Sequence, residues 1–552
     1  MDQNRTLLAI ALSLAILLGY QYFFVPPIPQ DQQQEGQAPH GEQTAKGEAP
    51  ATAPSPVSTA PTAPGTLAVT VDPEARDITV DTPNYTAVIS EQGGTIKSFL
   101  LKAYRRGIKQ DSGPMELAPS DNPGNRPLAF SLDNAATSSL PRYTADNAQS
   151  HLEVEQGTGE LRMTTTLPNG LEIVRSMRFS ADSYLIPVEY TVNNTGDAAV
   201  QISPALIWHH QPFPHENPPS SYLFAGPEAW VNNDLVEIKE KALLKGPVLH
   251  QGAISWAGYS DSYFLTACMP GSEGPQTLSV QAEGTGQRSV LSGGVRTLEP
   301  RGSAQFSYTL YMGPKKLTML QAAGHDLSRA VDYGWLTVIA QPMLWLLNFF
   351  HSFTHNYGVA IILLTIVIKA VFWPVTQKGM KSMKNMQKLQ PKITKLREKF
   401  KKDPAAMNRE MMNLYKTYKV NPMGGCLPMV IQIPFFFALY RVLMQAIELR
   451  HAPFMLWIND LSMPDRLWLG FDIPWLHGLP VLTLLMGASM FLQQKMTPTP
   501  TADPTQLRIM QWLPIIFTFM FINFASGLVL YWFINNLLTM LQQYLINRSV
   551  KA

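Results

Sequence analysis

The chain has 552 residues, too many for one domain, and only 15% of them are charged while 45% are hydrophobic. This balance, with 25 Met and 11 Trp, argues against a wholly soluble protein and suits a membrane protein with a soluble part. The net charge of +2 excludes little, because the charges are segregated along the sequence. Cys268 and Cys426 fall in regions expected on opposite sides of a membrane, so no disulfide is predicted between them.

Residues 1–25 predict an N-terminal transmembrane anchor with a cytoplasmic N-terminus. The apolar run from Thr6 to Val25 follows a short head that holds Arg5. A cleaved signal peptide is the alternative, but the run is long and lacks a small-residue cleavage site. Residues 26–65 are rich in Pro, Ala, Gln and Thr and cannot build a core, so they predict an extended, disordered tether.

Residues 66–325 predict a large all-β domain on the side of the membrane opposite the N-terminus. From residue 66 to about Met312, β-branched or alternating segments are separated by turn signals, which is typical of a β-sandwich of about 250 residues. The runs Leu161–Leu167 and Leu171–Phe179 flank a Pro-Asn-Gly turn and predict a hairpin.

Three histidines lie close together within this region, at His209, His210 and His215. Their spacing matches no familiar metal-ligand pattern, so a polar loop with solvated histidines is predicted instead of a metal site. No metal and no cofactor is expected.

The helical half of the chain begins with residues 326–357, which predict an amphipathic helix in the membrane interface because aromatic residues and histidines crowd an apolar stretch. A further full span is the alternative. Residues 358–376 then predict the second span, which contains Lys369. A charge inside a span costs roughly 2.5–3.5 kcal/mol near its centre. Snorkelling of the lysine toward the cytoplasmic surface is one explanation for it.

Residues 377–421 are the most charged part, with a net charge of +10, so the positive-inside rule makes them cytoplasmic. Apolar residues recur there every three or four positions, and Asp403-Pro404 has the signature of a helix start, which together predict a helical hairpin. Its apolar stripes either pack only on each other or form a docking surface, since Met-rich faces adapt to varied partners. The candidate docking residues are Lys381, Lys388, Lys395, Met383 and Met411.

Four further spans are predicted after the hairpin, which makes six in all. The expected segments are the spans 423–445, 479–496, 507–524 and 527–546, a periplasmic loop at 446–478, a cytoplasmic loop at 497–506 and a cytoplasmic tail at 547–552. With this count, Arg5, the basic hairpin and the C-terminus all fall on the cytoplasmic side, as the charge rule requires.

Polar residues inside the predicted spans form the candidate site. Thr365 lies four residues before Lys369, so both share one helix face, and no Asp or Glu lies deep in a neighbouring span. Because an uncompensated charge implies water, we expect a hydrated cavity open to the cytoplasm. The chain has no phosphate-binding loop of the G-x-x-x-x-G-K-[ST] type, so ATP is not its direct energy source. The candidate cavity residues are Lys369, Thr365, Gln494, Trp532, Gln432 and Asn536.

Several stretches carry a family resemblance. They are the segment from Tyr415 that contains NPMGGCLP, the run QIPFFFALY at Gln432–Tyr440, Gln494-Lys495-Met496, and SGLVLYW at Ser526–Trp532. Through them the chain resembles, from end to end, the YidC family of membrane protein insertases, which is found also in mitochondria and chloroplasts.

The resemblance implies a multi-span α-helical protein of a Gram-negative inner membrane, with one anchor helix, a five-helix insertase core and a periplasmic β-supersandwich similar to sugar mutarotases. It implies an ATP-independent insertase and chaperone, not an enzyme, with a groove open to cytoplasm and lipid. Lys369, Gln494 and Trp532 match groove positions, although the usual family residue at 369 is arginine, which forms bidentate contacts that lysine cannot make. The implied partners are nascent membrane proteins, the Sec translocon and its accessory proteins, the ribosome and signal-recognition machinery and the phospholipid bilayer, without nucleic-acid specificity.

Two other functions compete with this interpretation. A membrane-anchored periplasmic enzyme or sugar-binding protein would depend on the β domain and on His209, His210 or His215. A small-molecule channel would conduct ions across a bilayer and would make no contact with nascent chains.

Overall fold

The structure is a computed structural model that describes residues 71–109, 111–120, 122–133, 140–146, 150–216, 223–271, 274–400, 403–418, 427–474, 476–496 and 504–549. The described residues all belong to one compact unit, residues 68–552. The predicted anchor at 1–25, the predicted tether at 26–65 and the NPMGGC segment at 421–426 lie outside them.

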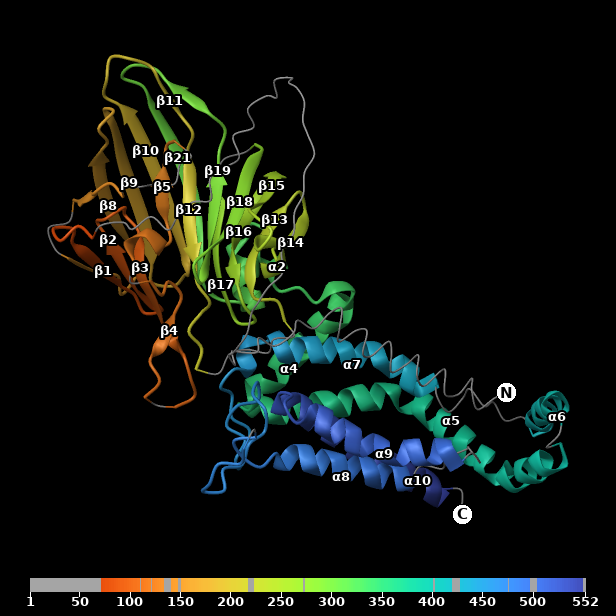
Figure 1. Cartoon of the computed structure of the whole chain (residues 1–552). Helices are drawn as coiled ribbons and strands as arrows, with labels where there is room; N and C mark the ends of the chain where they lie inside the picture. The colour runs from red at the N-terminus through yellow and green to blue at the C-terminus, as the bar shows by residue number, and fades with distance from the viewer. Residues whose placement is uncertain are drawn as a thin grey trace, which may run out of the picture. The chain divides into compact units, whose positions relative to one another are not determined.

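The first half of the described chain is built from β-strands in layered sheets (Figure 1). The largest sheet has nine strands in the order β14 (Asp234–Glu237), β13 (Gly226–Val231), β16 (Ile254–Ser260), β17 (Phe264–Pro270), β21 (Ser303–Pro314), β10 (Leu185–Asn194), β9 (Leu171–Ser180), β8 (Thr158–Thr166) and β6 (Thr144–Ala145). A five-stranded sheet has the order β4 (Pro114–Glu116), β3 (Ile96–Arg105), β2 (Tyr85–Ser90), β1 (Asp77–Asp81) and β7 (His151–Glu153).

Two smaller sheets complete this part, with two single-turn helices between strands. One has the order β15 (Val248–Gly252), β18 (Gln276–Glu283), β19 (Gly286–Ser292), β12 (Ala205–His210) and β5 (Ala129–Ser131). The other pairs β11 (Val200–Ile202) with β20 (Arg296–Leu298). The short helices are η1 (Pro123–Asn125) and α2 (Glu240–Leu243). The predicted β-sandwich is therefore confirmed.

The predicted hairpin at Pro168-Asn169-Gly170 is also confirmed. Strands β8 and β9 pair antiparallel on either side of this turn, with Leu161 opposite Met177. Gly170 has a φ of 79°, a backbone conformation that favours glycine. Along β9 the odd-numbered residues from Leu171 to Phe179 are buried, because alternate residues of a strand face one side of the sheet.

The prediction of a polar loop with solvated histidines is wrong for all three histidines. His215 does lie in a loop, but its side chain is only 4% exposed and its Nε2 atom lies 2.5 Å from Oδ2 of Asp261. His209 and His210 end strand β12 and pair with β19, where His209 lies opposite Arg288. The side chain of His210 is only 4% exposed and stacks on Tyr259, with ring centroids 5.5 Å apart. The segment Ala205–His210 is buried almost throughout, so apolar packing on both faces keeps two polar residues inside a strand.

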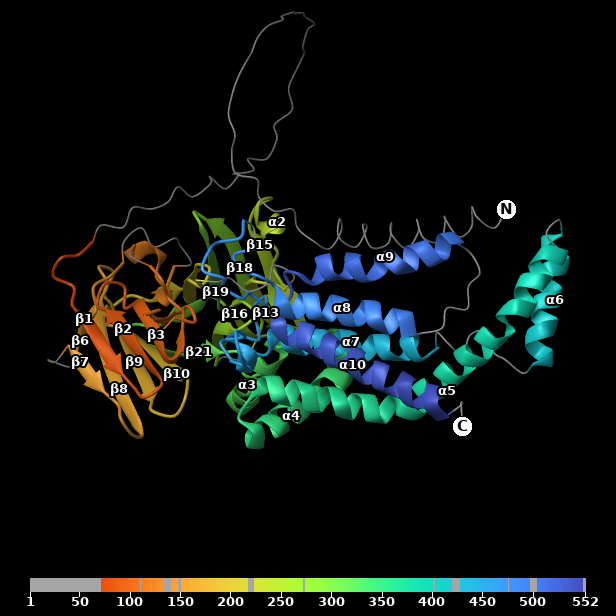
Figure 2. The ribbon, with the colours of Figure 1, turned by 90° about the horizontal axis from the view of Figure 1, so that it is seen from below.

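The second half of the described chain is helical, and α5, α7, α8, α9 and α10 run side by side (Figure 1, Figure 2). The elements are α3 (Leu317–Ala323), η2 (Leu327–Ala330), η3 (Gly334–Leu336), α4 (Thr337–Thr354), α5 (Tyr357–Lys399), α6 (Pro404–Thr417), α7 (Leu427–Gln445), η5 (Ile447–Leu449), α8 (Val481–Met496), α9 (Pro504–Phe521) and α10 (Ser526–Ser549). Buried apolar residues such as Ala360, Leu439 and Leu528 form its core.

Helix α5 continues through the predicted boundary at residue 376, so the second span and the first half of the hairpin are one helix of 43 residues. It starts at Asn356, whose side chain accepts a hydrogen bond from the backbone N–H of Val359 at 3.1 Å. A helix satisfies its backbone hydrogen bonds internally, and it can therefore run from an apolar environment into water without a break. The change from apolar to charged residues at position 377 therefore predicts that the helix passes from an apolar environment into water. It does not predict that the helix ends there.

The second helix of the predicted hairpin starts where the sequence indicates. Asp403 accepts hydrogen bonds from the backbone N–H groups of Ala405 and Ala406 at 3.1 and 3.0 Å, and Pro404 is the first helical residue. The helix α6 packs against the C-terminal half of α5, where Met386, Leu389 and Ile393 of α5 meet Met411, Leu414 and Tyr415 of α6. The predicted N-cap is confirmed.

Among the described residues, two helical segments are long and apolar enough to cross a membrane, Gly334–Thr354 and Tyr357–Leu396. Ile431–Gln445 and Met510–Phe521 are shorter apolar helices. The first of the two long segments includes α4, for which the sequence predicts an interfacial position with a span as the alternative. The exposed aromatic residues of this segment include Trp335, Trp345 and Phe353.

Candidate functional site: a buried lysine among helices

Lys369 lies in α5 with its amine directed into the helical bundle. Its side chain is only 6% exposed, and Nζ donates a hydrogen bond to Oγ1 of Thr539 in α10 at 2.6 Å. On the opposite side of α5, Val367 and Val371 are exposed, as expected for residues that face lipid. The lysine therefore does not extend toward a helix end in this structure, as snorkelling requires.

No carboxylate compensates the charge of Lys369 in the part of the chain that the structure describes. The sequences of α7, α8, α9 and α10 contain no Asp or Glu. The ion pairs among the described residues do not include Lys369. A buried charge needs hydrogen bonds or a counter-charge to offset its lost hydration. Among the described residues, the hydroxyl of Thr539 supplies the hydrogen bond that offsets the lost hydration of Lys369.

The Thr539 hydroxyl is oriented for this role. It donates its own hydrogen to the carbonyl of Asn535 at 2.6 Å, and a lone pair of the same oxygen is thereby left to accept from the ammonium. The side chain of Asn535 accepts a hydrogen bond from Nε2 of Gln432 at 3.3 Å. Helix α10 thus links α5 to α7 through consecutive polar contacts. The predicted Gln432 contacts Asn535, and Asn535 in turn contacts Thr539, the partner of Lys369.

Thr365 and Asn536 are also buried, close to these hydrogen-bonded residues. Thr365 is 1% exposed, and its hydroxyl donates to the carbonyl of Ile361 at 2.6 Å, so it is satisfied within α5. Asn536 donates from Nδ2 to Oγ of Ser489 in α8 at 2.9 Å. The polar face of α10 therefore also contacts α8.

A second polar link joins α5 and α10 closer to the end of the predicted span. Gln542 donates from Nε2 to the Thr376 hydroxyl at 2.9 Å and to the Trp373 carbonyl at 3.3 Å. Both Thr376 and Gln542 are buried. The sequence prediction of the site omitted Thr376, Thr539 and Ser489. The spacing of Asn535, Thr539 and Gln542, which places them on one face of α10, is the signal that could have revealed part of this set.

Trp532 and Gln494 contact other helices. The Trp532 ring lies 5.1 Å from Phe436 of α7 and 5.8 Å from Phe521 of α9 between ring centroids, in edge-on geometry. Its indole N–H is buried and has no hydrogen-bond partner among the described residues. Gln494 of α8 donates to the Met510 carbonyl of α9. These two predicted residues pack the helices beside the Lys369 contacts, and neither of them hydrogen-bonds the lysine.

The predicted docking residues of the hairpin differ in exposure. Lys381, Lys388 and Lys395 are exposed and lie seven residues apart, so they share one face of α5. Met383 is half-buried. Met411 packs against the buried residues of α5 and belongs to the contact between the two helices.

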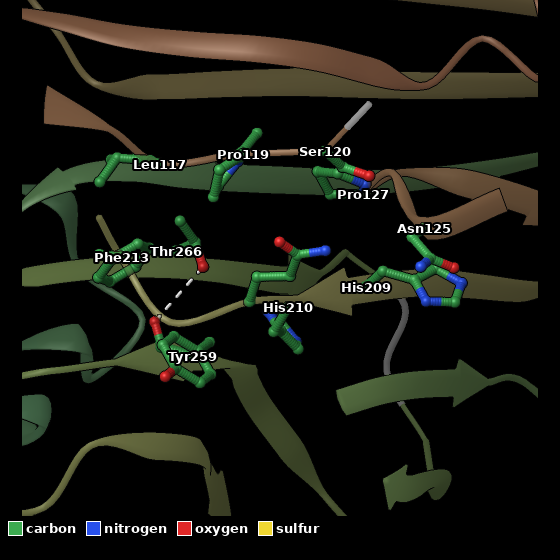
Figure 3. A pocket seen from close by; sticks show the side chains of 12 residues that line it. Leu117, Pro119, Ser120, Asn125, Pro127, His209, His210, Phe213, Tyr259 and Thr266 are labelled. Atoms are coloured by element: carbon green, nitrogen blue, oxygen red, sulfur yellow. Dashed lines mark hydrogen bonds between the residues drawn. The ribbon is translucent and has the colours of Figure 1, made fainter. Parts of the chain in front are cut away.

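His209 and His210 of the β domain line a very small cavity (Figure 3). Its volume is about 10 Å³, room for no more than one water molecule. His209, His210 and Tyr259 line it together with Thr266, whose hydroxyl donates to the Tyr259 carbonyl at 3.4 Å. A monosaccharide does not fit this space. The described residues contain no group of three or more His, Cys, Asp or Glu that could hold a metal ion.

Two family models match the chain. The model of the 60Kd inner membrane protein matches residues 349–552, and the model of the YidC periplasmic domain matches residues 77–346. A protein named membrane protein insertase YidC from Syntrophobacter fumaroxidans is 41% identical to the chain, and the match covers 99% of this chain and 100% of that protein.

Solved structures are more distant in sequence. A crystal structure of an active YidC insertase with its first transmembrane domain resolved is 19% identical, with a TM-score of 0.37, and the match covers 87% of this chain and 94% of that one. A galactose mutarotase-like protein from Lactobacillus casei is 11% identical with a TM-score of 0.31, and the match covers 43% of this chain and 99% of that one.

Proposed function

Because the chain belongs to the YidC family of membrane protein insertases, we propose that Lys369 and its polar neighbours line a hydrated groove through which client proteins enter the lipid bilayer. The protein is an inner-membrane insertase, its substrates are membrane proteins, and insertion is not an enzymatic reaction. The full-length similarity supports this function over that of a periplasmic sugar-binding protein or enzyme.

The main observation behind the proposed groove is a buried cation for which the described residues supply no counter-charge. The ammonium of Lys369 is held by one hydroxyl, that of Thr539, and the neighbouring helices α7 to α10 supply no carboxylate. Such a cation is stabilised by water and by any anionic group that approaches it. Acidic residues in the polar tail of a client would therefore be attracted to Lys369.

Insertion through such a groove needs no ATP. A hydrated path halfway across the bilayer lowers the cost of moving a polar tail, which is a few kcal/mol per charged residue. A client segment of about 20 apolar residues, at −0.3 to −0.6 kcal/mol each, gains roughly 6–12 kcal/mol on entering lipid. The membrane potential adds about 2.3 kcal/mol per charge for each 100 mV and draws acidic residues outward.

The test is insertion of two otherwise identical clients, one with an acidic tail and one with a neutral tail, into proteoliposomes. Lys369→Ala should slow insertion of the acidic-tailed client and affect the neutral-tailed client less, while Lys369→Arg should retain activity. Lys378→Ala removes an exposed positive charge from the same helix, outside the proposed docking residues, and serves as the matched control. Unchanged insertion of the acidic-tailed client by Lys369→Ala would refute the role of this charge.

The proposed topology has six spans, cytoplasmic termini and a periplasmic β domain, with Gln494 and Trp532 in the groove wall. The net charge of +10 over residues 377–421 supports a cytoplasmic hairpin. Trp457 and Trp468 in the connection between α7 and α8 support a position at the opposite membrane surface. Reporter fusions that are active only in the periplasm should be active after residue 312 and inactive after residue 410.

The exposed lysines of the hairpin are proposed to receive clients from the ribosome and the signal-recognition machinery, and the insertase to work alone or beside the Sec translocon. Lys381, Lys388 and Lys395 form a positive row on one face of α5, which suits an anionic ribosomal surface. The triple change to Gln should weaken co-sedimentation with ribosomes that carry a nascent membrane protein. The matched control is the triple change to Arg, which keeps the charge.

A further inference from the structure

We infer that the adjacent residues Asp465 and Arg466 form a clasp that holds the ends of α8, α9 and α10 together and closes the groove at that end of the bundle. This inference rests on the proposed function, because it assigns the closed end of the proposed groove to specific side chains. The clasp lies in the connection between α7 and α8, residues 446–480, which contains little regular structure apart from η5.

Asp465 binds the N-terminus of α8 from outside that helix. Its side chain is buried, and Oδ2 accepts hydrogen bonds from the backbone N–H groups of Leu482 at 2.5 Å and Thr483 at 3.2 Å. The other carboxylate oxygen accepts from the indole N–H of Trp457 at 2.5 Å. The first N–H groups of a helix have no partner within it and carry partial positive charge, so a carboxylate is the group that suits them best.

Arg466 binds a helix end of the opposite kind, the C-terminus of α9. Its guanidinium donates to the carbonyl of Ile522 at 2.9 Å and to the side-chain oxygen of Asn523 at 2.9 Å. The last carbonyl groups of a helix carry partial negative charge and lack partners within the helix. Two consecutive residues of opposite charge therefore bind two helix ends of opposite polarity.

The backbone of the same connection binds the start of α10. The N–H of Ser526 donates to the Met463 carbonyl at 2.8 Å, and the N–H of Gly527 donates to the Leu461 carbonyl at 2.9 Å. The Ser526 hydroxyl donates to the Asp460 carbonyl at 2.8 Å. Residues 460–466 thus satisfy backbone groups at the ends of α8, α9 and α10, and little polar backbone is left at this end for water to solvate.

The clasp lies at the end of the bundle opposite the hairpin. Asn356, which caps the start of α5, donates from Nδ2 to the carbonyl of Phe454 in the same connection at 2.8 Å. The hairpin follows at the other end of the same 43-residue helix. Lys369 lies 12 residues after Tyr357, a rise of about 18 Å along α5. The clasp therefore closes the groove between Lys369 and the Tyr357 end of the bundle, while the end near the hairpin stays free to open.

The test measures from which side water-soluble reagents reach the groove. Cys268 and Cys426 are changed to Ser, and Ser489→Cys supplies a buried reporter in α8. A membrane-impermeant maleimide is added to the periplasmic side of right-side-out vesicles that contain the full-length protein. Asp465→Asn and Arg466→Gln should each raise the labelling rate from that side about tenfold, the effect of weakening closure by about 1.4 kcal/mol, close to the value of one hydrogen bond to a charged group.

Asp472→Asn is the matched control. Asp472 lies in the same connection and is exposed, and its ion pair among the described residues is with the exposed His477, at 3.1 Å. Its change should therefore leave labelling at the level of the parent. Arg466→Lys keeps the charge with fewer donors and should give an intermediate rate, and it supplies the measurement if the other variants fail to fold. Labelling of Arg466→Lys at the parent level, or of Asp465→Asn at the level of Asp472→Asn, overturns the clasp. The labelling rate does not depend on insertion activity. A failure of the Lys369 insertion test would therefore not decide the outcome of the labelling test, and the two proposals can be judged separately.

Discussion

Lys369 and Thr539 are 170 residues apart in the sequence, and the 2.6 Å hydrogen bond between them joins α5 to α10. The threonine hydroxyl can accept from the ammonium because it already donates to the Asn535 carbonyl. The contact gives a cation inside the bundle one polar partner and leaves its remaining donors available. The proposed groove requires such donors, because water or an acidic residue of a client can accept hydrogen bonds from them.

The hydroxyl of Thr539 is expected to stabilise the buried ammonium. Thr539→Val keeps the shape and removes the acceptor, so the free energy of unfolding should fall by about 1.5–3 kcal/mol, the range for a hydrogen bond to a charged group. Thermal unfolding in lipid nanodiscs measures the effect. Thr539→Ser should restore most of the stability. Thr518→Val, which removes a hydroxyl that donates only to the Pro514 carbonyl, is the control, and an equal loss in both Val variants would contradict the prediction.

Gly487 is expected to be essential for the contact between α8 and α9. A Cβ atom at this position would lie 2.1 Å from Oγ1 and 3.2 Å from Cβ of Thr518. Gly487→Ala should destabilise the protein by about 1–3 kcal/mol, the usual cost of overpacking. Thr518→Ala removes the nearest atom, so the double variant should be more stable than the sum of the two single changes indicates, and strict additivity in denaturation experiments would argue against the close approach.

Asp403 is expected to hold the start of α6. Asp403→Ala removes the acceptor for two backbone N–H groups and should reduce the local stability of the helix by about 1 kcal/mol, while Asp403→Asn should cost much less. Hydrogen exchange of the Ala405 and Ala406 amides measures this directly, with about a fivefold acceleration expected in the Ala variant. Exchange at unchanged rates in Asp403→Ala would show that α6 does not depend on this cap.

The β domain is expected to lose stability in acid because of its buried histidines. Burial, with a smaller contribution from Arg288, lowers the pKa of His209 to about 4, and burial holds the pKa of His210 well below the usual value near 6.5. Between pH 6.5 and 4 the unfolded chain therefore binds protons that the folded domain does not. The stability is fully present above pH 6.5 and falls as the pH drops, by up to about 1.4 kcal/mol per pH unit for each histidine.

His210→Phe tests this expectation. Phenylalanine can stack on Tyr259 and Trp208 as the imidazole does, and the Nε2 atom that it removes has no hydrogen-bond partner among the described residues. Denaturant unfolding of the full-length protein at pH 7.5 and pH 5 should show a smaller acid loss for this variant. His151→Phe, at an exposed position of β7, is the control, and identical acid losses in parent and His210→Phe would exclude the buried histidine as the cause.

Local patterns predicted much of the helical part. Helices α7, α8, α9 and α10 lie in segments where long hydrophobic runs predict helices, because runs of this length mark helices with little ambiguity. The prediction failed at residue 376, where charge pattern changes but the helix does not end. It also failed at His209 and His210, because polarity is a poor guide to burial when stacking aromatic rings surround a side chain.

Local sequence patterns were enough to predict the β character of the first part, the apolar helices of the second and the cap at Asp403, because these features depend on neighbours a few positions away. The sequence also determined the family, through motifs that are read locally. Three contacts became visible in the folded structure and not before: Thr539 is the partner of Lys369, Met411 packs inside the hairpin, and Asp465 and Arg466 bind the ends of separate helices. Such contacts join residues far apart in the chain, and side-chain geometry in the packed bundle, not spacing along one helix, selects them.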